Sequence, residues 1–468
     1  MFDDRYVDVL RPVFAGRRWI IAIDDLSATT SLVDALNALD AAAVMVVAGR
    51  RGAGPVPTSG AEICVVDLPP PTRLGGSRSW DAALVDLPRR VRRAIDAFDP
   101  YGEAQVITAL LTTLRTVAQR AVFGARDPSW LRLEDRAVVD RIWRVAGVRD
   151  VRRLVVPGEP RALRAAAAEV DLGDGTVWVS DHHDGWNGRD GYLRWVRTRV
   201  DADDAAALFD GRASRVRVMP FLDGIPCSID GLVFPDDVVV LRPAEMLVLR
   251  RPVDSRLCYA NSATLWDPPE ADREEMRRTA ADVGSYLRGA LDYRGAFTID
   301  GVMTRDGFVP IELNPRYGSM MGAVARASGA PLYLLTLALM AGADLDIDPR
   351  RLERELLEVA DRHRVAHASL HLPRPRLHTE DVGLLWTGTE FAVVPGDEAD
   401  ALLTLGPGPR NGSSLRLVLD TDRHPVGPSI GPKVVSAFGI ADDLWDLGLG
   451  PLEAAPDLGR ERAPAESS

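Results

Sequence analysis

Asp300 and Glu312 are the two residues of this chain whose types and spacing best suit catalytic chemistry. Asp300 lies in A-F-T-I-D-G-V, Glu312 lies in V-P-I-E-L-N-P-R, and the turn signal T-R-D-G at 304–307 separates them. A hairpin with its apex at Asp306 places the two acids opposite each other, where like charges destabilise a sheet. The spacing therefore predicts a cation between the two carboxylates.

Asn314 and Arg316 continue the same face of the second strand, because strand side chains two residues apart point the same way. Two carboxylates and an amide oxygen are ligands that suit Mg²⁺, which also takes oxygens from substrate phosphates. We therefore expect Asp300, Glu312 and Asn314 to bind Mg²⁺, with Mn²⁺ as an alternative ion. Arg316 would add a fixed positive charge near the transferring group.

A competing interpretation is that the acidic pair belongs to an ordinary solvated hairpin and that Asn-Pro simply begins a turn. The opposite face of the two strands is apolar throughout: Phe297, Ile299, Ile311 and Leu313. This pattern predicts that both strands are built into a core, where unpaired acids are costly. The metal-site interpretation is therefore favoured.

The pattern D-(11 residues)-E-x-N-P-R, followed by the turn Y-G-S, resembles the metal-binding signature of the ATP-grasp superfamily. Enzymes of that superfamily join a carboxylate to a nucleophile, often an amine, through an acyl phosphate made from ATP. The resemblance implies that Asp300, Glu312 and Asn314 hold Mg²⁺ against the phosphates of ATP. It also implies that Arg316 is catalytic, stabilising the acyl phosphate or the tetrahedral intermediate.

The phosphate contacts implied by this resemblance fall on earlier segments. Arg136, near the start of an expected helix, stands where family members usually carry a lysine, although a plain surface arginine is an equal interpretation. Ser180 ends the strand 177–180, where the family has a second lysine. The segment 184–191 (D-G-W-N-G-R-D-G) resembles the family's glycine-rich flap, so Gly188 would cover the phosphates and Arg189 would restore the missing charge.

The segment 216–222 resembles the family's hinge strand, whose backbone contacts adenine. Met219 stands where most family members have a glutamate, and Met219, Phe221 and Leu222 equally suit ordinary core positions. Glu245 follows another apolar strand and is a further candidate to face the site. The residues assigned to ATP binding are Arg136, Ser180, Gly188, Arg189, Met219, Phe221, Leu222 and Glu245.

The expected fold class is α/β (α+β). The β-α-β rhythm of residues 19–48 predicts a small parallel sheet, with helices expected at 80–96 and 103–121. The resemblance implies that residues 1–130 form a doubly wound pre-ATP-grasp domain. The resemblance implies an ATP-grasp nucleotide- and metal-binding core over 131–349. A small mixed C-terminal domain at 350–445 and a disordered tail at 446–468 complete the expected organisation.

Composition excludes several classes of protein. A net charge of −12 argues against a general nucleic-acid binder. The longest apolar stretch, 332–341, is too short to span a bilayer, and the three scattered cysteines fit a reduced cytosol, so we expect a cytoplasmic protein. Lys433 is the sole lysine of the chain, so any lysine role before it must be filled by arginine or by nothing.

A narrower resemblance, to bacterial peptide ligases of pheganomycin type, rests on the segments G-I-P-C-S-I-D-G, L-R-P-A-E and R-G-A-F-T-I-D-G-V together with E-L-N-P-R. It implies natural-product biosynthesis, with a small carboxylate (an amino acid or derivative) and an amine or peptide as substrates. Family members are often homodimers. Two alternatives stay open: a ligase with another nucleophile, such as bicarbonate or a thiol, and a scaffold that has lost catalysis, suggested by Ser180 and Met219.

Overall fold

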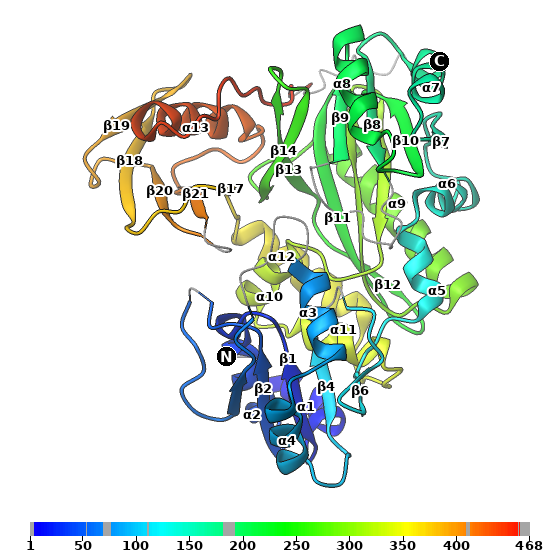
Figure 1. Cartoon of the computed structure of the whole chain (residues 1–468), viewed down its shortest axis with the longest axis vertical. Coiled ribbons are helices and arrows are strands. Elements are labelled where there is room, and N and C mark those ends of the chain that lie inside the picture. Colours follow the sequence, from blue (N-terminus) through cyan, green and yellow to red (C-terminus); the bar gives the residue numbers. More distant parts are fainter. Residues whose placement is uncertain are drawn as a thin grey trace.

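The structure is a computed structural model, and it describes residues 4–52, 54–68, 76–109, 112–180, 192–408, 412–456 and 458, without the side chains of 76–79, 136 and 137. The chain forms an N-terminal sheet, a small antiparallel sheet, a central antiparallel sheet and a C-terminal sheet, in that order (Figure 1). The candidate residues lie on the second and third of these sheets.

The N-terminal sheet is parallel, in the order β3-β2-β1-β4. Its strands are β1 (Arg18–Ala22), β2 (Ala43–Ala48), β3 (Glu62–Val65) and β4 (Gln105–Thr108), and its helices are α1 (Asp4–Phe14), α2 (Thr30–Ala38), α3 (Gly76–Val85) and α4 (Arg89–Phe98), with the short η1 (Leu26–Thr29). Trp19 and Ile21 pack toward α1 and α2, whereas Ile20 and Ala22 pack toward the side of α4. Both faces of the sheet are therefore covered, as a doubly wound sheet requires.

The helix expected over residues 103–121 does not form in the described parts of that segment, 103–109 and 112–121. Residues 105–108 instead form β4, which pairs in parallel with β1, and two short strands follow, β5 (Thr116–Val117) and β6 (Arg120–Ala121). The run Val106-Ile107-Thr108 is buried and rich in β-branched residues, which favour strands. Tertiary pairing with β1 outweighs the helical pattern of that segment.

A small antiparallel sheet follows, in the order β7-β10-β8-β9. It is reached through α5 (Pro128–Leu131), η2 (Arg132–Glu134) and α6 (Arg136–Val145), and it contains β7 (Leu154–Pro157), α7 (Pro160–Val170), β8 (Thr176–Ser180), β9 (Leu193–Val196), α8 (Arg199–Phe209) and β10 (Arg215–Pro220). Val216 and Val218 of β10 pack toward the helices with Trp178 of β8. The alternate side chains of these strands therefore face away from the helices.

The central sheet is antiparallel, in the order β14-β13-β11-β15-β16, with β12 paired to β11. Its elements are β11 (Ile225–Val233), β12 (Val238–Val240), β13 (Ala244–Arg251), β14 (Arg256–Ala263), α9 (Glu270–Leu291), β15 (Gly295–Thr304) and β16 (Gly307–Asn314). Helix α9 and helix α6 cover one face, where Phe297, Ile299 and Leu313 are fully buried. The other face carries the acidic residues.

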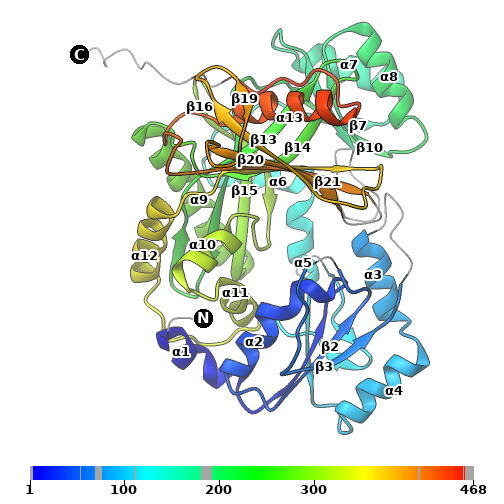
Figure 2. The same ribbon diagram turned by 90° about the vertical axis from the view of Figure 1, so that its left-hand side faces the viewer.

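Three helices connect the central sheet to the N-terminal sheet: α10 (Met321–Ser328), α11 (Leu332–Met340) and α12 (Pro349–Arg362). Their apolar residues share one cluster with α1, α2 and one face of β1 and β2, and Figure 2 shows α10 and α11 between the two sheets. Among the described residues, no single helix has the length and apolarity to cross a membrane, although the sharply bent pair α10–α11 passes that test as a unit.

The C-terminal sheet is antiparallel, in the order β17-β21-β20-β18-β19, with α13 on one face. Its elements are β17 (His367–Leu372), β18 (Glu380–Trp386), β19 (Phe391–Val394), β20 (Ala401–Pro407), β21 (Ser413–Leu419) and α13 (Gly431–Trp445). Lys433 of α13 is buried, and its Nζ lies 4.9 Å from the ring centroid of Trp386. The segment 446–456, expected to begin a disordered tail, differs from that expectation: Leu449 is buried, and Glu453 forms a bridge with Arg250.

Candidate functional site

A β-bulge sets the register of the hairpin that carries the acidic pair. The chain turns at residues 305–306, where Thr304 pairs with Gly307, whose φ of +124° favours glycine. The register shifts by one residue after the pair formed by Gly301 and Pro310, so that Asp300 pairs with Glu312. The predicted pairing is therefore confirmed, although the apex lies earlier than Asp306 and the bulge supplies the extra residue.

The bulge also changes the position of Ile311. We expected Ile311 on the apolar face with Ile299 and Leu313, which are fully buried in the central core. Ile311 instead lines a cavity next to Glu312. Simple alternation along β16 fails here, because an inserted residue reverses the facing of every side chain on one side of it.

A chain of polar contacts joins the acidic pair to the loop before α6. Asn314 donates from Nδ2 to Asp300 Oδ2 at 2.8 Å, and Arg316 donates from Nη2 to Asn314 Oδ1 at 2.8 Å. Arg316 Nε lies 3.8 Å from Glu134 Oε1, and Arg126 donates to the same oxygen at 2.6 Å. These contacts place Arg316 beside the acidic pair, and nothing in the sequence pattern indicated Glu134 or Arg126.

Acidic side chains are concentrated on this face of the central sheet. Burial, followed by the neighbouring Glu312 carboxylate, raises the pKa of Asp300 to about 8, against the opposing effects of Arg316 and Asn314. Asp230 of β11 accepts a hydrogen bond from the Thr298 hydroxyl at 2.5 Å, and burial raises the pKa of Asp230 to about 6. A bound cation would stabilise the ionised carboxylates and oppose both increases in pKa.

The residues present fit a magnesium ion. Paired carboxylates from Asp300 and Glu312 form a hard oxygen set, open to additional oxygens from a phosphate. The adjacent Asn314 amide donates to Asp300 in this structure, and turning the amide group would add its oxygen to that set. Among the described residues, no group of three or more His, Cys, Asp or Glu side chains is arranged to hold a metal. The set therefore depends on the amide and on a phosphate as additional ligands.

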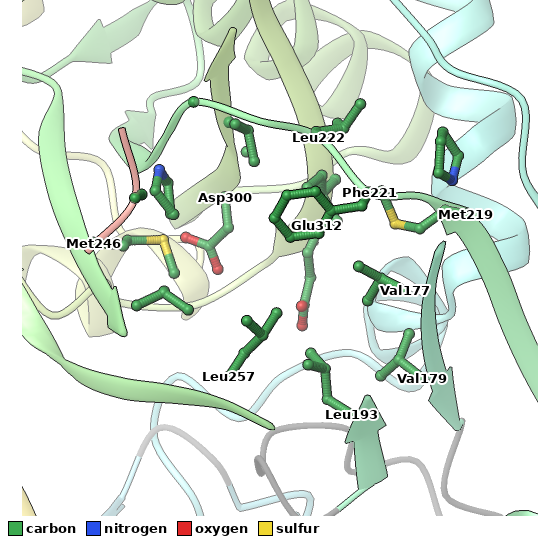
Figure 3. Close-up of a pocket in the computed structure, with 18 of the residues that line it drawn as sticks. Val177, Val179, Leu193, Met219, Phe221, Leu222, Met246, Leu257, Asp300 and Glu312 are labelled. Atoms are coloured by element: carbon green, nitrogen blue, oxygen red, sulfur yellow. The ribbon is translucent and has the colours of Figure 1, made fainter. Parts of the chain in front are cut away.

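An apolar cavity of about 200 Å³ adjoins the acidic pair. Val177, Val179, Leu193 and Met219 from the small sheet line it, with Phe221 and Leu222 from the following segment and Met246 and Leu257 from the central sheet. Figure 3 shows the carboxylates of Asp300 and Glu312 among these apolar side chains. The cavity suits a molecule with a flat apolar part and an anionic part that brings a cation.

The structure brings together some of the residues assigned to ATP binding. Met219, Phe221 and Leu222 line the cavity with the acidic pair. Ser180 is buried at the end of β8, where it pairs with Val216, and it is not among the lining residues. Arg136 is the first residue of α6, but its side chain, like Gly188 and Arg189, lies outside the described residues.

Glu245 lies elsewhere. Its buried carboxylate accepts hydrogen bonds from the Ser429 hydroxyl and, at 3.1 Å, from the Ile430 amide, at the start of α13. The next residue on β13, Met246, is the one that lines the cavity. The expectation that Glu245 faces the nucleotide does not fit this geometry, because adjacent strand residues point to opposite faces.

Arg217 is a residue of the cavity wall that the sequence patterns did not single out. It is fully buried on β10, between Val216 and Val218, which face the helices. An arginine at the alternate position of an otherwise apolar strand was the available signal. A buried arginine is expected to face polar or charged groups that pair with its guanidinium.

Comparison with solved structures identifies the fold. This chain is similar to the N5-carboxyaminoimidazole ribonucleotide synthetase purK in its ADP complex (14% identity, TM-score 0.50, 92% of this chain and 98% of that chain). It is also similar to biotin carboxylase from Campylobacter jejuni in a β,γ-ATP complex (13% identity, TM-score 0.55, 86% and 87%). A third is the biotin carboxylase domain of 2-oxoglutarate carboxylase from Hydrogenobacter thermophilus, a dimer with MgADP (11% identity, TM-score 0.50, 94% and 91%).

The chain therefore has the multidomain ATP-grasp architecture. No protein-family model matches the sequence, and no curated protein matches it significantly. At these identities the likeness establishes the fold, and the activity must be argued from the site.

Proposed function

We propose that this protein is an ATP-dependent ligase that joins a carboxylate to an amine through an acyl phosphate and releases ADP and phosphate. The observation that carries the proposal is the pairing of Asp300 with Glu312 in the wall of an apolar cavity between two sheets of an ATP-grasp fold. Such a cavity accommodates adenine, and the carboxylate pair accommodates the metal ion that accompanies the phosphates.

In this proposal, Met219, Phe221 and Leu222 enclose the adenine. Asp300, Glu312 and Asn314 would hold Mg²⁺, which would supply charge neutralisation at the phosphates of ATP. Arg316 is the catalytic residue, because its guanidinium lies beside Asn314 and can stabilise developing oxyanion charge. Arg136, Ser180, Gly188 and Arg189 stay as proposed phosphate contacts.

The reaction proceeds in two steps. An oxygen of the substrate carboxylate attacks the γ-phosphorus, and the bond from that phosphorus to the oxygen bridging the β- and γ-phosphates breaks, which releases ADP. The amine nitrogen then attacks the acyl carbon, phosphate leaves, and the nitrogen loses a proton to solvent. Positioning and electrostatic stabilisation carry most of such a reaction.

A second cavity is the proposed site of the small carboxylate. It measures about 570 Å³ and lies between the N-terminal sheet and helices α10 and α11. Its lining includes Tyr317, next to Arg316 in the chain, together with Arg326 and Tyr333. The size of the cavity and its arginine suit an amino acid or a derivative of one. The narrower proposal is a peptide ligase of natural-product biosynthesis that takes a peptide as its amine substrate and assembles as a homodimer.

Removing one acid of the pair tests the proposed function. We expect Glu312→Ala to reduce ADP release that depends on both a carboxylate and an amine by about a hundredfold or more, since one metal ligand is lost. Asp306→Ala is the matched control, because Asp306 is exposed at the turn of the same hairpin. The measurement is ADP release across a panel of amino acids and peptides. Equal release by wild type and Glu312→Ala would reject the ligase.

Ser180 and Met219 favour a second candidate, a nucleotide-binding scaffold without catalysis. Both residues stand where the family's patterns place charged side chains, and both are buried. Tight binding of Mg-ATP without ADP release across the whole panel would support that candidate. If ADP is released but no amide forms, product mass spectrometry with bicarbonate and thiols identifies a different nucleophile.

A further inference from the structure

The bulge in β16 decides which side chain faces Asp300. On the side of the bulge nearer the turn, β15 and β16 pair in one constant register. It begins with Thr304 opposite Gly307 and continues to Gly301 opposite Pro310. If β16 kept that register, Ile311 would lie opposite Asp300. Glu312 would then point into the apolar core, because a slip of one residue exchanges the two faces of a strand. The contacts that stabilise the bulge therefore also stabilise the position of Glu312 opposite Asp300.

Two buried arginines bind the carbonyl groups at the bulge. Arg153 donates from Nη2 to the Pro310 carbonyl at 3.1 Å, and Arg217 donates from Nη1 to the Ile311 carbonyl at 3.0 Å. These are the two residues that precede Glu312. Pro310 has no N–H to contribute to the sheet, which is typical of a strand position at a bulge.

One carboxylate orients both arginines. Asp140 Oδ1 on α6 accepts from Arg153 Nη1 at 2.7 Å and from Arg217 Nη2 at 3.3 Å. The side chains of Arg153 and Arg217 are 2% and 0% exposed, so both guanidinium groups depend on protein partners. A rigid guanidinium fork can bind a carboxylate and a carbonyl at once, which a single ammonium cannot do in the same geometry.

We infer that Arg153 and Arg217, oriented by Asp140, are positioning residues for the metal site. Their hydrogen bonds to the Pro310 and Ile311 carbonyls fix the bulge that brings Glu312 opposite Asp300. This inference rests on the proposed function, because it assigns the carboxylate pair to Mg²⁺. It extends that function by giving the small sheet a part in metal binding, since Arg217 lies on β10.

The decisive variant is Arg153→Met. Arg153 is not among the residues that line the apolar cavity, so its replacement leaves the nucleotide contacts in place. Arg120→Met is the matched control: Arg120 is 7% exposed and pairs with Asp99 at 2.9 Å beside the N-terminal sheet, so it also removes a buried guanidinium. Calorimetry would measure the affinity for a non-hydrolysable ATP analogue over a series of Mg²⁺ concentrations, and the affinity for ADP without metal.

We expect Arg153→Met to raise the Mg²⁺ concentration needed for half-maximal binding by about tenfold or more, as the loss of groups that orient metal ligands commonly does. Its affinity for ADP without metal should stay within about twofold of wild type, because the substitution changes no residue that lines the nucleotide cavity. Arg120→Met should change neither quantity. A Mg²⁺ requirement in Arg153→Met equal to that of wild type would overturn the inference.

Two additional results separate the possible failures. If the wild type binds the analogue with no dependence on Mg²⁺, the proposed function fails before the role of the arginines is tested. If Arg153→Met does not fold, Arg153→Lys decides, because a lysine keeps the charge but loses the fork. A Mg²⁺ requirement in Arg153→Lys that lies above wild type supports the inference, and an unchanged requirement rejects it.

Discussion

At the scale of single residues, Asp300 lies where its negative charge is costly. Burial and the nearby Glu312 keep a proton on Asp300 up to about pH 8. The sequence predicted this proximity from spacing alone, because the turn signal and the two apolar runs bound the hairpin on both sides. It did not indicate Glu134 or Arg126, since these residues reach Arg316 only through tertiary packing.

The raised pKa predicts how Mg²⁺ binding and stability depend on pH. Because Asp300 must release its proton to bind metal, Mg²⁺ affinity should rise by up to about tenfold per pH unit below pH 8. Without metal, Asp300 holds its proton more tightly in the folded chain than in the unfolded chain. Its contribution to stability is therefore complete below about pH 4 and is lost as pH rises through 8.

The measurement is the unfolding temperature from pH 6 to 8.5, with and without Mg²⁺, in wild type and Asp300→Asn. We expect the metal-free wild type to lose stability over this range and Mg²⁺ to reduce that loss. Asp300→Asn should show a smaller dependence on pH, because the asparagine does not titrate. An equal dependence in both proteins would contradict the assignment.

At the scale of elements, the hairpin of β15 and β16 shows where sequence patterns reach their limit. The alternation of side chains correctly placed Ile299 and Leu313 in the core. It failed at Ile311, because an inserted residue breaks the alternation and leaves no periodic signal in the sequence. Glu245 shows a related limit: the strand was expected, but which of two adjacent residues faces the cavity depends on packing across the sheet. The signals in favour of a bulge were Pro310 and the glycine opposite it.

Gly301 is that glycine, and replacing it tests the hairpin. A Cβ on Gly301 would lie 2.5 Å from the Phe308 ring and 2.5 Å from the Val309 carbonyl oxygen. We therefore expect Gly301→Ala to lower the free energy of unfolding by about 1–3 kcal/mol, the range for overpacking a core. Gly289→Ala is the control, because a Cβ there meets nothing within 4 Å in helix α9.

Urea unfolding of both variants is the measurement. Gly289→Ala should be neutral or slightly more stable, since alanine favours a helix over glycine by about 0.5–1 kcal/mol. If Gly301→Ala is as stable as wild type, the close packing opposite Pro310 is not a constraint on this hairpin.

At the scale of the whole molecule, the sheets are joined by shared cores and by buried polar contacts. The cluster shared by β1, β2 and α10–α12 links the N-terminal sheet to the helices that follow the hairpin of β15 and β16. Much of the order of the elements was predictable from the different periods of strands and helices, but residues 105–108 form strand β4 where a helix was expected. The contacts between the sheets could not be predicted, because they depend on residues far apart in the sequence, such as Glu245 and Ser429.

Glu245 connects the central sheet to the start of helix α13, so its replacement should affect stability and not nucleotide binding. We expect Glu245→Ala to lower the free energy of unfolding by about 2–4 kcal/mol, because two hydrogen bonds to a buried carboxylate are lost. Denaturant unfolding and the affinity for an ATP analogue would be measured on the same samples. Glu390→Ala, which changes an exposed residue in the turn between β18 and β19, is the control. A Glu245→Ala variant that is as stable as wild type but binds the ATP analogue poorly would contradict this prediction and support a contact between Glu245 and the nucleotide.

The burial of Lys433 has a consequence for chemical self-protection. An acyl phosphate is an acylating agent, and the side-chain amines of lysine are its ordinary targets on a protein surface. In this chain the sole lysine is packed against Trp386 inside the C-terminal domain, and every other basic side chain apart from histidine is a guanidinium. In the proposed ligase, an acyl phosphate would meet almost no competing side-chain amine, which would leave the acyl group to the substrate amine.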